Sequence, residues 1–94
     1  RAFLAGELGK RGAVAHPSLG NFLLVELPIP FGPIEPEFAR RGVILRPMGG
    51  WGFPLAFRLS VGRHDENLRF LAVFDELLDA GRLGLNARTS SFAR

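Results

Sequence analysis

The chain has 94 residues, enough for one small domain that buries about 60% of the surface of its extended form. It contains no cysteine, which excludes disulfides, thiolate metal sites and thiol nucleophiles and fits a protein of the reducing cytoplasm. The formal charge of +3 comes from 12 basic and 9 acidic residues, and no apolar run approaches the roughly 20 residues of a membrane-spanning helix.

The basic residues suit a small anion better than a nucleic acid. Nearly all of them are arginine, with Lys10 as the lone lysine. They are scattered along the chain, and Arg40 and Arg41 form the only adjacent pair. A nucleic-acid interface would concentrate positive charge on one element, whereas a single guanidinium already offers a planar fork to a carboxylate or a phosphate.

Residues 1–10 predict a helix, since apolar residues recur on one of its faces and Gly9 or Gly12 can end it in a left-handed conformation. No capping residue precedes this helix, so we expect the chain to start inside an element, as a fragment would. Residues 13–15 predict a short strand that ends at His16 and Pro17, because proline disfavours a helical residue before it.

Residues 21–27 predict a central strand covered on both sides, because their apolar run is continuous. Prolines between Pro28 and Pro36 then indicate an extended connection. Residues 35–41 predict about two helical turns, with Pro36 tolerated in the first turn and Gly42 ending them.

Residues 42–62 contain two strand-like runs, each with one arginine, joined by a glycine-rich loop. The first run, 43–46, ends in Arg46. The second run, 55–61, alternates, so Arg58 lies between small side chains on the face opposite the apolar one. Arg58 is thus placed to bind an anion, although an ion pair with Glu26 is an equally good interpretation. For Arg46, a strand-end arginine in solvent is the simpler interpretation.

Residues 64–80 predict an amphipathic helix with an apolar stripe that contains Phe70, Phe74 and Leu77. The acids along it, Asp75, Glu76 and Asp79, read as its solvated edge. Gly81 ends this helix, and residues 82–94 predict a loose extension. The elements together predict an α+β fold, with helices against a small, mainly antiparallel sheet.

The chain offers little catalytic chemistry of its own. His16 and His64 are far apart and have no metal-ligand spacing, and no nucleophile-elbow motif occurs. The glycine-rich loop at 49–52 lies between two strands, whereas a phosphate-binding loop opens a helix.

Five segments of the sequence are similar to segments of a known protein family. They are, in chain order, LGKRGAVAHPSLGNFLLVEL, RGVILRPM, GGWGFP, LAFRLSVG and RHDENLRFLAVFDELL. The chain resembles the C-terminal small domain of fold-type I aminotransferases that use pyridoxal 5'-phosphate (PLP), in particular histidinol-phosphate aminotransferases. The resemblance covers residues 1 to about 80, so the implied domain is 1–81, with 82–94 as an extension. Arg63 departs from the threonine that usually caps the last helix, which leaves Asp65 or a shifted start to cap it, and Trp51 replaces a common tyrosine.

The resemblance implies roles for three residues. Arg58 would bind the carboxylate of the amino donor and the phosphate of histidinol phosphate in turn. The implied reaction is transamination between histidinol phosphate and 2-oxoglutarate in histidine biosynthesis. Arg46 would help to hold the phosphate. Asn21 would lie near the substrate.

The resemblance also implies a larger enzyme. Its cofactor lysine and the acid that faces the cofactor belong to a large domain of the same protein, so this chain alone should bind no PLP and be inactive. The intact enzyme is expected to be a cytoplasmic homodimer with no membrane or nucleic-acid partner. The alternative is a stand-alone, non-catalytic binding domain of the same fold.

Overall fold

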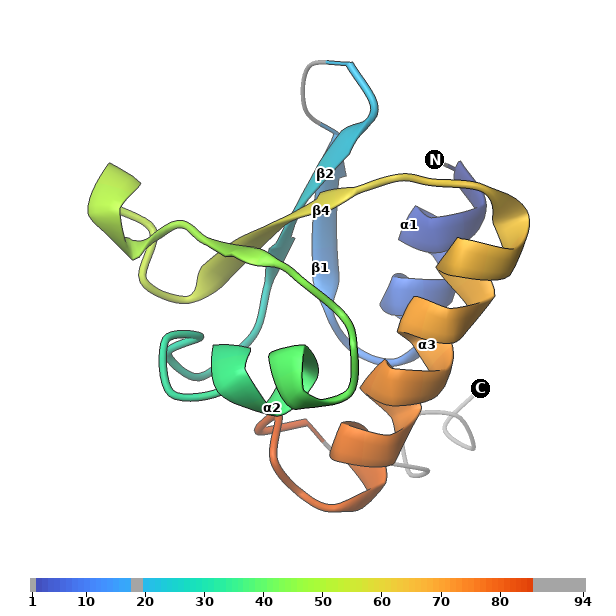
Figure 1. Ribbon diagram of the computed structural model, residues 1–94. Helices are drawn as coiled ribbons and strands as arrows, with labels where there is room; N and C mark the ends of the chain where they lie inside the picture. The colour runs from blue at the N-terminus through green and yellow to red at the C-terminus, as the bar shows by residue number, and fades with distance from the viewer. Residues whose placement is uncertain (1, 18–19, 86–94) are drawn as a thin grey trace.

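A computed structural model describes residues 2–17 and 20–85. Within these residues, three helices and four strands form the fold (Figure 1). The helices are α1 (Ala2–Lys10), α2 (Glu35–Arg40) and α3 (His64–Asp79), and the strands are β1 (Val14–Pro17), β2 (Phe22–Glu26), β3 (Arg46–Pro47) and β4 (Ala56–Ser60). A short 3-10 helix, η1 (Gly49–Trp51), precedes β4. The strands pair in the order β1-β2-β4-β3, antiparallel throughout, which confirms the predicted α+β fold.

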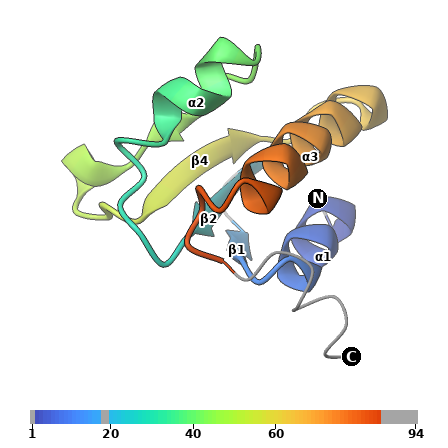
Figure 2. The same ribbon diagram turned by 90° about the horizontal axis from the view of Figure 1, so that it is seen from below.

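All three helices pack on one face of the sheet, which we call the core face (Figure 2). The two central strands present alternate apolar side chains to it, Leu23 and Val25 from β2 and Phe57 and Leu59 from β4. Five phenylalanine rings meet in this layer, at positions 31, 38, 57, 70 and 74. The closest pair, Phe31 and Phe57, has its ring centroids 4.6 Å apart. The chain therefore builds its core from rings that converge from loops, strands and helices.

The opposite face of the sheet, which we call the open face, carries no helix in the described part of the chain (Figure 2). Phe22, Leu24 and Glu26 of β2 point to this face and are half-buried. The central position of β2 confirms one prediction, but the expectation that both of its sides are covered was wrong. A continuous apolar run indicates a strand without telling how many of its faces are covered.

The edge strands differ from their predicted lengths. β1 continues through His16, which pairs with Leu24, to Pro17, which pairs with Leu23. Proline fits here because an edge strand needs no donor on its outer side. The run 43–46 forms ladder pairs only from Arg46 onward, and Val43 and Leu45 instead bury their side chains in the core.

Helix α3 confirms the predicted stripe, since Phe70, Phe74 and Leu77 are buried. The capping prediction was wrong. Asp65 does not cap the helix, and the backbone N–H of Arg63 instead donates to Glu66 Oε1 at 2.8 Å. A carboxylate three residues into the helix satisfies a backbone donor as a capping box does.

The acids of α3 lie at a solvated edge, as predicted, since Glu76 and Asp79 are exposed and Asp75 is half-buried. Two of them also join α3 to other segments of the chain. Arg11, just after α1, donates to both carboxylate oxygens of Asp75, at 2.6 and 3.0 Å. Arg41, just after α2, donates to Glu76 at 2.9 Å. Each pair joins segments that are distant in sequence. The spacing of residues within one helix cannot predict such a pair.

The first residues after α3 pack on the domain. Gly81 ends the helix with φ +74°, as predicted. Leu83 is fully buried in the core, and Arg82 donates to Glu37 at 2.7 Å. Residues 82–85 are thus not loose, and the rest of the predicted extension, 86–94, lies outside the described residues.

None of the helices in the described ranges has the length and apolar character that crossing a membrane requires.

Candidate functional site

Arg46 and Arg58 lie side by side on the open face. Arg46 pairs with Arg58 in the β3–β4 ladder, and Leu24 pairs with Arg58 on the other side. Phe57 and Leu59 fill the core face, so Arg58 points to the open face between Ala56 and Ser60, as the alternation predicts. The antiparallel register brings together two arginines that are separated by a loop in the sequence.

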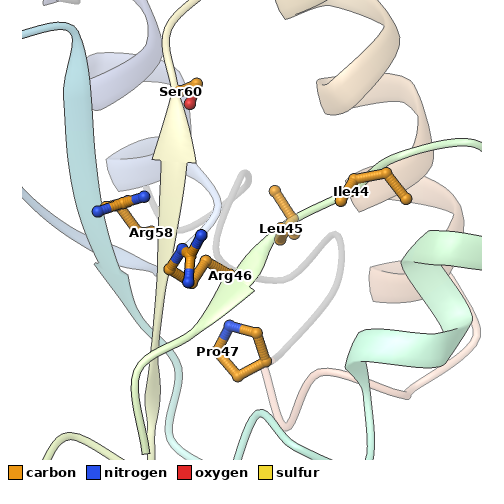
Figure 3. Close-up of a pocket in the computed structure, with 6 residues that line it drawn as sticks. All are labelled: Ile44, Leu45, Arg46, Pro47, Arg58 and Ser60. Carbon is orange, nitrogen blue, oxygen red and sulfur yellow. The ribbon is translucent and has the colours of Figure 1, made fainter. Parts of the chain in front are cut away.

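Both arginines line a hollow of about 340 Å³ (Figure 3). Its six lining residues are Ile44, Leu45, Arg46, Pro47, Arg58 and Ser60. The hollow lies where the chain joins β3, beyond the last ladder pair of β4 with that strand. Two cations and one hydroxyl therefore border a space of the size that a small anion needs.

These two arginines differ from the others that the structure describes. Arg11, Arg40, Arg41, Arg63 and Arg82 each pair with a carboxylate.

Arg69 donates to the carbonyl oxygen of Arg41 at 3.0 Å. Within residues 2–17 and 20–85, only Arg46 and Arg58 have neither a carboxylate partner nor a hydrogen-bond acceptor. Their N–H donors are free for a ligand.

The expected alternative for Arg58, an ion pair with Glu26, does not form. Glu26 Oε1 lies 2.9 Å from Nε2 of His16 instead. The Arg58 guanidinium carbon lies over the ring of Phe22, 4.4 Å from its centroid. In the view of Figure 3, the end of the Arg58 side chain lies over β2, whereas Arg46 stays beside β4.

Asn21 is not brought into this hollow. It is exposed just before β2, and its backbone oxygen accepts a hydrogen bond from Val61 N at 2.6 Å. Trp51 is also absent from the lining, and 68% of its surface is exposed on η1.

Sequence reasoning missed two residues of this site, Ser60 as a lining residue and Phe22 as the contact of Arg58. Period-2 alternation places Phe22 on the face of Leu24 and Glu26. Only the register of β2 against β4 shows that this is also the face of Arg58.

The described residues do not fit a PLP site. Lys10 is the chain's only lysine, and it lies at the end of α1, in the helical layer, where it pairs with Glu7 at 3.0 Å. It does not line the hollow. The described ranges also contain no group of histidine and acidic residues that could hold a metal ion. What the arrangement can do chemically is bind and orient an anion.

Comparison with known proteins gives this geometry a context. No protein-family model matches the chain. It is 44% identical to a histidinol-phosphate aminotransferase of Anaeromyxobacter over 81 residues, which are 85% of this chain and 22% of that protein. It is 44% identical to histidinol-phosphate aminotransferase 2 of Pseudomonas aeruginosa over 62 residues, 66% of this chain and 17% of that protein.

A solved structure shares the fold. A crystal structure described as that of a candidate aminotransferase from Burkholderia pseudomallei matches 81% of this chain and 23% of its own, with a TM-score of 0.72 and 30% sequence identity. The chain thus spans about a fifth of the length of the relatives it matches. In sequence this chain resembles one part of the histidinol-phosphate aminotransferases, and in fold it resembles one part of an aminotransferase structure.

Proposed function

We propose that the chain is the C-terminal small domain of a PLP-dependent aminotransferase and that its open face binds the anionic groups of the substrates. This proposal rests on one observation, the placement of Arg46 and Arg58 side by side without a hydrogen-bond acceptor. They are ladder partners, they line one hollow, and they are the two described arginines whose donors have no acceptor. A protein that leaves two adjacent guanidiniums unpaired bears their mutual repulsion, which a bound anion relieves.

In this proposal Arg58 binds the carboxylate of the amino donor and, in turn, the phosphate of the second substrate, and Arg46 adds a second fork for the phosphate. Each hydrogen bond to a charged group contributes about 1.5–3 kcal/mol. The chain thus binds the anionic groups of the substrate and orients the substrate, so that its amine is held in position to react. Asn21 lies outside the hollow, so a direct role for it requires a substrate that reaches the end of β2.

The names of the relatives support histidinol phosphate as the phosphate-bearing substrate. With it come a place in histidine biosynthesis and glutamate/2-oxoglutarate as the carboxylate-bearing substrate pair. The cofactor and its lysine would come from a large domain of the same protein, since the residues described here do not fit PLP. The intact enzyme would be a cytoplasmic homodimer.

The proposal is tested in the intact protein that contains this chain. Arg58→Ala should raise the apparent Michaelis constants for both substrates by about 10- to 150-fold, the loss of one charge-assisted hydrogen bond. Arg46→Ala should raise mainly that of the phosphate-bearing substrate. The cofactor absorbance should stay unchanged in both variants.

Arg40→Ala is the matched control, because Arg40 is an exposed arginine of α2 that pairs with Glu37 outside the hollow. Its Michaelis constants should equal those of the parent. Unchanged constants in Arg58→Ala, or a lost cofactor signal, would contradict the role given to Arg58.

The alternative, a stand-alone binding domain, has one observation in its favour: the described residues form a core and a hollow without any other chain. The coding sequence separates the two. A cofactor-lysine motif about 100 residues or more upstream supports the enzyme, and a start codon directly before Arg1 supports the stand-alone domain.

A further inference from the structure

We infer that Phe22 is the positioning residue of Arg58, an inference that rests on the proposed anion site. Phe22 stands on the open face of β2, and its ladder partner is Ser60. Arg58 is the ladder partner of Leu24, so Phe22 and Arg58 are diagonal neighbours across the two central strands. A long side chain can cross that distance, and the Arg58 guanidinium carbon does so, reaching 4.4 Å from the ring centroid.

The chemistry of this contact suits an anion site. A carboxylate in the place of Phe22 would hold Arg58 still, but it would neutralise the charge and occupy the N–H donors. An aromatic ring attracts the cation through its electron-rich face and accepts none of those donors in an ordinary hydrogen bond. Phe22 thus restrains Arg58 and leaves its charge and its donors for the ligand.

No other neighbour of Arg58 in the described part of the chain is suited to restrain its guanidinium. Its neighbours along β4, Ala56 and Ser60, are too short to hold a guanidinium, and its ladder partner Arg46 repels it. The only acid of β2, Glu26, is engaged by His16. Among the described residues, the Arg58 cation has no ion pair or hydrogen-bond acceptor, and the ring of Phe22 is its one electrostatic partner.

A bound anion gains from this restraint. A free arginine side chain loses rotational freedom when it binds, and a side chain that is already held loses less. Attraction between a cation and a ring at a partly exposed site corresponds to about a two- to fivefold change in affinity. Loss of the ring should therefore weaken the binding of an anion by about that factor.

The test uses the 94-residue chain, inorganic phosphate as the probe, and nuclear magnetic resonance. The Nε–Hε signal of Arg58, assigned by its disappearance in Arg58→Ala, reports the ring directly, because a proton over an aromatic face is shielded. In Phe22→Leu this signal should lose its shielding and its relaxation should show a more mobile side chain. The phosphate dissociation constant should rise about two- to fivefold, and Phe22→Tyr, which keeps the ring, should restore all three values.

The outcomes separate this inference from the proposed function. If Arg58→Ala abolishes phosphate binding and Phe22→Leu changes neither the affinity nor the Arg58 signal, the anion site stands and the role of Phe22 is overturned. If phosphate binds equally well to the parent chain and to Arg58→Ala, or to neither, the proposed site fails. In that case the shielding of the Arg58 Nε–Hε signal and its relaxation, compared between the parent chain and Phe22→Leu, still show whether Phe22 restrains Arg58. A urea midpoint measured for each variant shows whether the sheet itself remains folded.

Discussion

Phe57→Ala should remove most of the stability of this domain. Phe57 is fully buried at the centre of the ring cluster, with its centroid 4.6 Å from that of Phe31, 6.1 Å from that of Phe38 and 6.3 Å from that of Phe70. It is also the residue directly before Arg58 in β4. The substitution therefore tests the core and the support of the site together.

The expected magnitude follows from this burial. Truncation of a buried phenylalanine to alanine costs about 3–5 kcal/mol, because the lost transfer energy is joined by a cavity that the neighbours cannot fill. A chain of this length is expected to have about 5–14 kcal/mol of stability, with small domains at the lower end. The variant should thus be close to unfolding at 25 °C.

The assay is urea unfolding followed by far-UV circular dichroism. Tryptophan fluorescence is a poor reporter, because Trp51 is already 68% exposed in the folded chain. Phe53→Ala is the matched control, since 48% of Phe53 is exposed and it lies outside the ring cluster, so it should cost below about 0.5 kcal/mol. A cost below about 1 kcal/mol for Phe57→Ala, or an equal cost for both variants, would refute the ring cluster as the centre of the fold.

Three further predictions concern the periphery of the domain. Leu83→Ala should destabilise the chain by about 2–5 kcal/mol in the same urea assay, although Leu83 follows the last helix, because it is fully buried; a shift within error would contradict its packing. Glu7→Gln should lower stability at neutral pH, because Arg11 holds the pKa of Glu7 below its ordinary value near 4.5. That stabilisation is present above about pH 4.5 and is lost as pH falls through the lowered pKa, so the urea midpoints of parent and variant should converge in acid. Gly42→Ala should cost about 1–2 kcal/mol or more, since Gly42 has φ +83° and a Cβ there would lie 2.7 Å from Arg69 Nη2. The cost should fall but stay positive in an Arg69→Ala background, and an undiminished cost would show that the contact with Arg69 is unimportant.

The sequence determined the three helices and the direction of Arg58. A 3.6-residue period, with Gly81 after it, predicted α3, and a 2-residue period placed Arg58 opposite Phe57. Both signals are local, because a helix or a strand repeats its own geometry along the chain. The same local logic predicted the end of α2 at Gly42.

Local sequence patterns were insufficient where contacts with distant segments determine the structure. His16 and Pro17 extend β1 because an edge strand tolerates proline, which depends on the strand order and not on the residues. Helical spacing correctly placed Asp75 and Glu76 at the solvated edge beside the apolar stripe, but it could not show their ion pairs. Their partners, Arg11 and Arg41, lie 64 and 35 residues away.

The sequence alone determined that the chain is an α+β domain with an arginine turned away from the core. The tertiary structure decided what surrounds that arginine: Arg46 beside it in the ladder, Phe22 beneath its cation, and Glu26 turned to His16. The physical reason is that strand pairing joins segments across loops, and the register of that pairing is set by the whole core. A spacing rule can tell to which face a side chain points, but only the packed sheet tells what it meets there.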